Sequence, residues 1–236
     1  HEAVVISPNE YPSFLKWLPG ENKILKYTQN PSEVQEKIRH ADMIFTLDFN
    51  ALDRIQELTD IVSKAPGHKI MIDHHENPSD YATLMYSKPG MSSTCEMVYD
   101  LIAALDATAF NPEIANCLYT GIMTDTGSFR FPSVSAKTHK ILAALLHTGI
   151  AHWQIHQDVY DNNRIDQLQL RGFAISEKLV LLNKKNSMVT LGVFSRSTIL
   201  MVLFIPLLLM LFLHAGILKR VLRINLRFDY RKLLMQ

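Results

Sequence analysis

Short apolar runs alternate with segments of helical spacing through the first 75 residues, and this alternation constrains the fold more than any other feature. The runs predict strands at residues 4–7, 23–27, 43–47 and 69–72. Apolar side chains recur at helical spacing between the last three runs, over residues 32–41 and 52–62. Strands that alternate with helices of about a dozen residues are typical of a doubly wound parallel sheet, so we expect an α/β fold.

Four further helices are predicted before residue 190, at residues 93–105, 112–123, 136–148 and 164–182. The chain holds two cysteines, Cys95 and Cys117, and neither lies in a Cys-x-x-Cys or a paired Cys/His spacing. A disulfide-stapled scaffold and a zinc finger are therefore excluded, and a reducing compartment is expected.

Acidic and imidazole side chains follow the apolar segments at three places. Asp48 follows one predicted strand, Asp73-His74-His75 follow the next, and Asp125 lies within the segment Gly-Ile-Met-Thr-Asp-Thr-Gly-Ser-Phe-Arg-Phe at 121–131. In open parallel sheets, ligands bind beyond the carboxyl ends of the strands. Hard divalent cations such as Mn²⁺ and Mg²⁺ prefer carboxylate oxygens with some imidazole, so the pattern predicts a site for such cations.

Each of these features also has an ordinary structural interpretation. An Asp at a strand end is most often a helix cap or a turn former, and Asp-Thr-Gly alone predicts a turn. Adjacent histidines are often surface residues. The joint occurrence of all three features after successive apolar segments is what favours a functional site.

Together, Asp48, the Asp73-His74-His75 sequence and the 121–131 segment resemble the DHH phosphoesterases, specifically the bacterial branch of bifunctional oligoribonucleases and PAP phosphatases. The resemblance covers about residues 1–190 and implies a DHH domain over residues 1–150 followed by linker helices at 151–192. It implies metal-dependent hydrolysis of short single-stranded RNA and of adenosine 3′,5′-bisphosphate (PAP) by two Mn²⁺ ions, with Mg²⁺ as the alternative. Such substrates imply a cytoplasmic protein; the oligomeric state is left open.

The resemblance also implies a set of metal ligands. Asp48 would bridge the two cations, and His74 and Asp125 would each be a ligand. The same family carries a His followed by an Asp-x-Asp pair at the end of its first strand, ahead of the position equivalent to His1. This sequence contains no such element, so we expect a DHH domain that lacks its first metal motif and a chain that is inactive or severely impaired.

Three further roles follow from the resemblance. His75 would face the scissile phosphate as a general acid or electrostatic stabiliser, and Asp73 would orient the neighbouring imidazoles. Arg130 is a candidate phosphate contact, with an ordinary surface arginine as the alternative. The hydroxyls of residues 92–94 precede a predicted helix, where they would either meet a phosphate or cap the helix.

The charge is divided unevenly along the chain. Residues 1–192 carry 17 Lys/Arg against 22 Asp/Glu, whereas residues 193–236 carry 7 against 1. An acidic body argues against a surface for duplex DNA, because such surfaces need clustered cations. A small substrate is therefore expected.

The tail at residues 193–236 is apolar and then basic. Residues 198–218 carry no charge and are long enough to cross a bilayer core of about 30 Å, and six Lys/Arg residues follow. A transmembrane helix, a frame-shifted sequence and a buried apolar helix are the three interpretations. The family's Gly-Gly-His substrate-binding motif has no counterpart after residue 190. If the tail is a membrane anchor, the alternative function is a membrane-associated nucleotide-binding or regulatory protein without turnover.

Overall fold

The computed structural model describes residues 3–161, 165–182 and 187–190. These residues fall into two units, which divide between Asn162 and Asn163. The predicted tail at 193–236, including the apolar segment at 198–218, lies outside the described residues. Within them, no helix has the length and apolar character needed to cross a membrane.

The first unit contains two small parallel sheets. Strands β1 (Ile6–Ser7) and β2 (Leu25–Lys26) pair with each other, and β3 (Met43–Leu47), β4 (His68–Asp73) and β5 (Leu84–Ser87) form a second sheet in that order. In the second sheet all neighbouring strands run parallel, so their carboxyl ends lie at one edge. Asp73, the last residue of β4, pairs with the last residue of β5.

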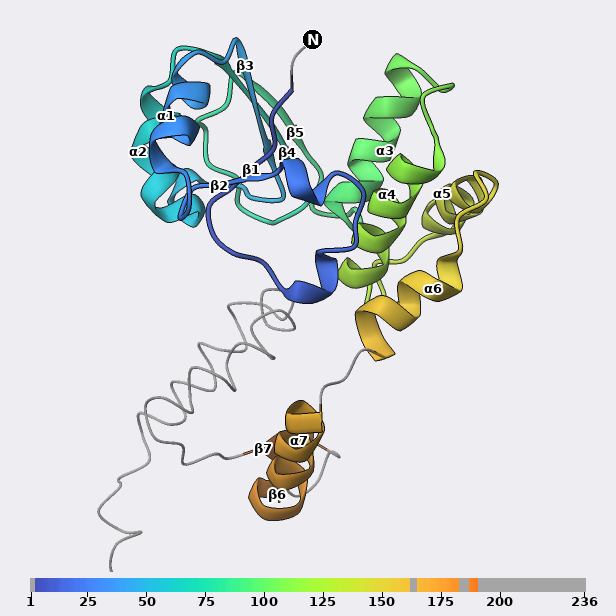
Figure 1. Ribbon diagram of the computed structural model, residues 1–236. Helices are drawn as coiled ribbons and strands as arrows, with labels where there is room; N and C mark the ends of the chain where they lie inside the picture. The colour runs from blue at the N-terminus through green and yellow to red at the C-terminus, as the bar shows by residue number, and fades with distance from the viewer. Residues whose placement is uncertain (1–2, 162–164, 183–186, 191–236) are drawn as a thin grey trace, which may run out of the picture. The chain divides into compact units, whose positions relative to one another are not determined.

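Helices α1 (Pro31–Arg39) and α2 (Thr59–Lys64) pack with the 3₁₀ helix η3 (Leu52–Leu58) on one face of the two sheets (Figure 1). Their core consists of six buried residues, Val34, Ile38, Ile55, Leu58, Val62 and Ala65. Side chains of β1, β2 and β3 all pack against that core, so the two sheets share one helical layer. The predicted single doubly wound sheet is therefore present as two ladders among the described residues, since β1 and β2 are only two residues long.

The remaining helices of the unit form a second core. They are α3 (Thr94–Leu105), α4 (Pro112–Asp125), α5 (Ala136–Leu146) and α6 (His152–His156), and a π-helical turn, Gln157–Asp161, follows. The buried residues of this core include Ile122, Met123 and Leu145. Helix α3 approaches the sheet from the face opposite α1 and α2, where the hydroxyl of Tyr86 on β5 donates to Asp100.

Part of that second face of the sheet is open. Met43, Phe45 and Leu47 alternate along β3 and expose 52%, 49% and 46% of their surfaces. Parallel sheets are normally covered on both faces. Helix α3 contacts β4, whereas these three side chains of β3 stay about half exposed among the described residues.

The second unit, over its described residues, contains α7 (Ile165–Lys178) and the antiparallel strands β6 (Leu179–Leu182) and β7 (Ser187–Thr190). The sequence predicts one helix through residue 182, and this is wrong for residues 179–182, which form β6. Their sequence Leu-Val-Leu-Leu is apolar throughout and so fits a buried strand as well as a helix, and pairing with β7 selects the strand.

The α/β class predicted from the sequence is confirmed. The strands expected at 43–47 and 69–72 and the helices expected at 93–105, 112–123 and 136–148 are all present within a few residues. Strand β5 and helix α6 are not predicted by the sequence. The 52–62 segment is 3₁₀ over its first part because Gln56 has a left-handed backbone, with φ 51°, which breaks a continuous helix.

Candidate metal centre

Asp48 turns the chain where β3 ends. Its φ is 68°, in the left-handed region that aspartate tolerates better than most residues. The Asp48 amide still donates to the carbonyl of Ile72 on β4, at 3.1 Å. The turn therefore leaves the backbone tied to the sheet and brings the carboxylate to the edge where the strands end.

Asn50 holds the loops after β3 and β4 together. It is 4% exposed, and its amide nitrogen donates to the carbonyl of Glu76 at 2.6 Å. Its backbone carbonyl accepts the amide and the hydroxyl of Ser79, at 2.8 and 2.9 Å. The loop that carries Asp48 is thereby fixed relative to the loop that carries the two histidines.

Asp73, at the end of β4, is fully buried and orients His75. One carboxylate oxygen accepts from the His75 ring Nδ1 at 2.7 Å, and the other accepts from the His75 amide at 2.8 Å. Burial by itself would raise the pKa of Asp73, but these hydrogen bonds hold that pKa below its ordinary value. The bond to Asp73 in turn raises the pKa of His75.

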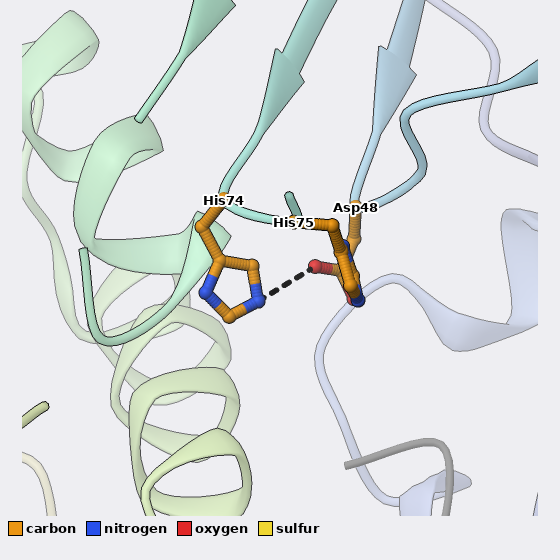
Figure 2. A group of neighbouring side chains, drawn as sticks. All are labelled: Asp48, His74 and His75. Atoms are coloured by element: carbon orange, nitrogen blue, oxygen red, sulfur yellow. Dashed lines mark ion pairs between the residues drawn. The ribbon is translucent and has the colours of Figure 1, made fainter. Parts of the chain in front are cut away.

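His74 is oriented by a different group. Its Nδ1 lies 3.1 Å from the carbonyl of Met91, which can only accept, so Nδ1 carries a proton, and in the neutral imidazole Nε2 then has a free lone pair. The Nε2 atom is buried and has no hydrogen-bond partner among the residues that the structure describes. It lies 3.6 Å from a carboxylate oxygen of Asp48. Figure 2 draws this pair as a dashed line. In this tautomer two lone-pair donors face each other, an arrangement that a shared cation satisfies.

Asp48, His74 and His75 together form a group that fits a metal ion. One ligand atom from each lies within 4.8 Å of the others, and the side chains meet from the ends of β3 and β4 (Figure 2). A carboxylate with two imidazoles is a donor set that suits Mn²⁺ and other first-row divalent cations. Buried polar atoms normally have a hydrogen-bond partner, and the Nε2 of His74 has none among the described residues, so a bound cation would supply the missing partner.

Asp125 approaches this group from the last turn of α4. Its carboxylate accepts from the hydroxyl of Ser93, and the next residue, Thr94, donates to the Asp48 carboxylate at 2.8 Å. Burial, together with the nearby charge of Asp48, raises the pKa of Asp125 to about 7. Two carboxylates held this close without a cation favour the binding of a proton.

Arg130 follows Asp125 after a tight turn. Gly127, Ser128 and Phe129 all have φ between 55° and 64°, so three successive residues are left-handed. The Arg130 Nε donates to the carbonyl of Gly127 at 2.7 Å, and the side chain is exposed. The predicted phosphate contact by Arg130 stays a prediction.

The structure thus brings Asp48, His74, His75 and Asp125 close together, and the loop of residues 91–94 contacts three of them. The sequence predicts that Asp73 orients both imidazoles, but within the described part of the chain its carboxylate accepts hydrogen bonds from His75, and the Met91 carbonyl orients His74. A backbone carbonyl leaves no signal in the sequence. Ser93 caps α3, since its oxygen accepts from the Cys95 amide, and its proton goes to Asp125.

Residues 5–122 match the model of the DHH family N-terminal domain. The chain belongs to the DHH family. Its relatives include the bifunctional oligoribonuclease and PAP phosphatase NrnA of Bacillus subtilis, which is 31% identical over 153 residues, or 63% of this chain and 47% of that protein. The NrnA protein of Thermus thermophilus is 32% identical over 139 residues, covering 59% of this chain and 39% of that protein. The DHH chain thus matches less than half the length of each relative.

A solved structure supports the same assignment. An exopolyphosphatase-related protein from Bacteroides fragilis is 43% identical with a TM-score of 0.73, over 75% of this chain and 52% of that chain. The comparison extends beyond residues 5–122 of the family match, because 75% of the chain exceeds that segment. The DHH fold therefore accounts for most of the described residues.

Proposed function

We propose that this chain is a metal-dependent phosphoesterase whose substrates are short single-stranded oligoribonucleotides and adenosine 3′,5′-bisphosphate. The observation that carries the proposal is the buried Nε2 of His74, which faces the Asp48 carboxylate without a hydrogen-bond partner. The substrate class comes from the names of the NrnA relatives, which describe an oligoribonuclease and PAP phosphatase.

Asp48, His74 and Asp125 would hold the cation, with Mn²⁺ as the expected ion. When bound, the cation neutralises charge on the phosphoryl oxygens and lowers the pKa of water. His74 offers Nε2 because the Met91 carbonyl fixes the proton on Nδ1. Thr94 and Ser93 hold the carboxylates of Asp48 and Asp125 through their hydroxyl protons.

His75 would act on the substrate. Asp73 accepts its Nδ1 proton and raises the pKa of His75 above its ordinary value, which favours the imidazolium form. A cationic imidazole can donate from Nε2 to a phosphoryl oxygen or to the leaving oxygen as negative charge develops there. Asp73 acts through His75 and would not touch the substrate.

The described donors are few for two cations. The proposed ligands are three side chains, Asp48, His74 and Asp125, whereas octahedral Mn²⁺ takes about six ligands. We therefore expect this chain to hydrolyse PAP roughly a thousandfold more slowly than the full-length Bacillus relative, a loss of about 4 kcal/mol of transition-state stabilisation.

The test separates binding from turnover. Mn²⁺ binding is measured by calorimetry, and hydrolysis of PAP and of a diribonucleotide is followed by chromatography. His74→Ala and Asp125→Ala are expected to weaken Mn²⁺ binding, whereas His75→Ala is expected to lower kcat with Mn²⁺ affinity retained. Lys64→Ala, on the exposed side of α2, is the matched control. Mn²⁺ affinity unchanged in both ligand variants would overturn the proposal, and binding without hydrolysis would favour a nucleotide-binding protein.

A further inference from the structure

The loop before α3 makes contacts with three candidate metal ligands. The Met91 carbonyl accepts from His74, Ser93 donates to Asp125, and Thr94 donates to Asp48. The ligands themselves come from three different places, the end of β3, the segment after β4 and the end of α4. The four-residue loop therefore contacts all three, and its position sets their mutual geometry.

Glu96 lies beneath this loop, in the first turn of α3. Its side chain is 1% exposed, although glutamate is rarely buried unless it is paired or hydrogen-bonded. The Ser92 hydroxyl donates to its Oε2 atom at 2.5 Å, and the Thr138 hydroxyl reaches the same atom at 3.2 Å. A single buried carboxylate oxygen thus binds the loop on one side and α5 on the other.

The α5 side of this network is itself fixed. Thr138 lies in the first turn of α5, where it forms a reciprocal capping box with Ser135. Both Thr138 and Ser92 are buried, at 0% and 3% exposure. Glu96 therefore connects the loop of residues 91–94 to a capped helix end.

Helix polarity does not account for this burial. An acidic residue in the first helical turn interacts favourably with the helix dipole, but an exposed glutamate does this without the cost of desolvation. The cost is offset here by hydrogen bonds from two hydroxyls, one from the loop that contacts the candidate ligands and one from the helix that anchors it.

We propose that Glu96 is a positioning residue for the metal centre. By binding both Ser92 and Thr138, it holds the loop of residues 91–94 at the position where the loop contacts the candidate ligands. Glu96 touches neither the cation nor the substrate. The inference rests on the proposed function, because it takes Asp48, His74 and Asp125 as the ligands. Interactions behind metal ligands typically contribute about 10- to 100-fold in metal affinity.

The experiment compares Glu96→Met with Glu96→Gln in the full chain. Methionine keeps the volume but provides no oxygen, whereas glutamine keeps one acceptor oxygen for Ser92 and Thr138. Ser92→Ala removes the hydroxyl by which the loop donates to Glu96, and this variant replaces Glu96→Met in the test if Glu96→Met does not fold. Leu145→Ala, a buried change in α5 away from the network, is the control for lost stability alone. Circular dichroism verifies that each variant is folded.

Two readouts are used. Calorimetry gives the Mn²⁺ dissociation constant, and nitrogen-15 spectra of the metal-free chain report which nitrogen of His74 carries the proton. Glu96→Met and Ser92→Ala are expected to weaken Mn²⁺ binding at least about tenfold and to reduce the Nδ1–H form of His74. Glu96→Gln and Leu145→Ala are expected to match the wild type in both measurements.

Wild-type Mn²⁺ affinity and an unchanged His74 tautomer in folded Glu96→Met would overturn the inference. Equal losses in Glu96→Gln and Glu96→Met would also overturn it, because the acceptor oxygen would then not be the cause. If the wild type itself binds no Mn²⁺, the proposed metal function fails. The His74 tautomer, measured without metal, then decides on Glu96 by itself.

Discussion

Replacement of Asp125 by asparagine is expected to stabilise the metal-free protein at alkaline pH. Burial and the charge of Asp48 raise the pKa of Asp125 from 3.8 to about 7. Between these two pH values the folded chain keeps a proton that the unfolded chain has released. The stabilisation from this protonated carboxyl is fully present below pH 3.8 and is lost as the pH rises through about 7.

The magnitude follows from the size of the shift. Each unit of pKa difference corresponds to about 1.4 kcal/mol, so a shift of about three units gives roughly 4 kcal/mol as an upper bound. The replacing asparagine carries no charge at any pH, and its side-chain oxygen can still accept from Ser93. Asp125→Asn is therefore expected to raise the free energy of unfolding by up to roughly 2 kcal/mol at pH 5 and by up to about 4 kcal/mol at pH 8.

The assay is urea unfolding in the presence of a chelator, at several pH values from about 5 to about 9, with wild type and Asp125→Asn compared at each pH. Added Mn²⁺ is expected to stabilise the wild type at pH 8 and to have little effect on the variant. Asp60→Asn, at an exposed position of α2, is the control for loss of a carboxylate. A stability difference that does not change with pH would refute the reasoning, as would a less stable Asp125→Asn chain at pH 8.

Three further changes test single contacts. Asp73→Asn is expected to lower the pKa of His75 below 6.5, because the hydrogen bond to the Asp73 carboxylate, which raises this pKa, is lost while the burial that lowers it remains. An NMR titration of the metal-free chain that finds the pKa of His75 still raised would contradict this. Gly121→Ala is expected to cost roughly 1–3 kcal/mol, since its Cβ would overlap the Cys95 sulfur, and Cys95→Ala in the same chain should recover part of that loss; additive effects in urea unfolding would argue against the overlap. Asn50→Ala is expected to cost about 1–3 kcal/mol and to weaken Mn²⁺ binding, which calorimetry can check.

Much of the fold could be predicted because its elements depend on periodic burial. The strand at residues 43–47 and the helix at 112–125 carry continuous or periodic apolar positions, and both are found close to the predicted bounds. Strand β5 could not be predicted in the same way. Its residues Leu84 and Met85 are 63% and 42% exposed, and its pairing with β4 comes from the tertiary structure.

The candidate site shows the same division. Asp48 and the two histidines could be predicted because carboxylates and imidazoles after strands are visible in the sequence. The Met91 carbonyl and the buried state of Glu96 could not, since one is backbone and the other looks like an ordinary acidic residue in a first helical turn. The candidate ligands are thus more predictable than the groups that hold them.

Without a cation, the candidate site lowers the stability of the fold. Asp125 is partly buried beside Asp48, so at pH 8 the chain must either keep a proton there or hold two neighbouring carboxylates charged. His74 adds a buried nitrogen without a partner at the same place. Each feature costs free energy in the absence of a cation, and one divalent ion would remove the carboxylate repulsion and satisfy the nitrogen together. Replacing these residues by apolar ones would relieve the cost but would also remove the ligands. The residues that make the metal-free fold less stable are therefore the ones expected to give the protein its affinity for Mn²⁺.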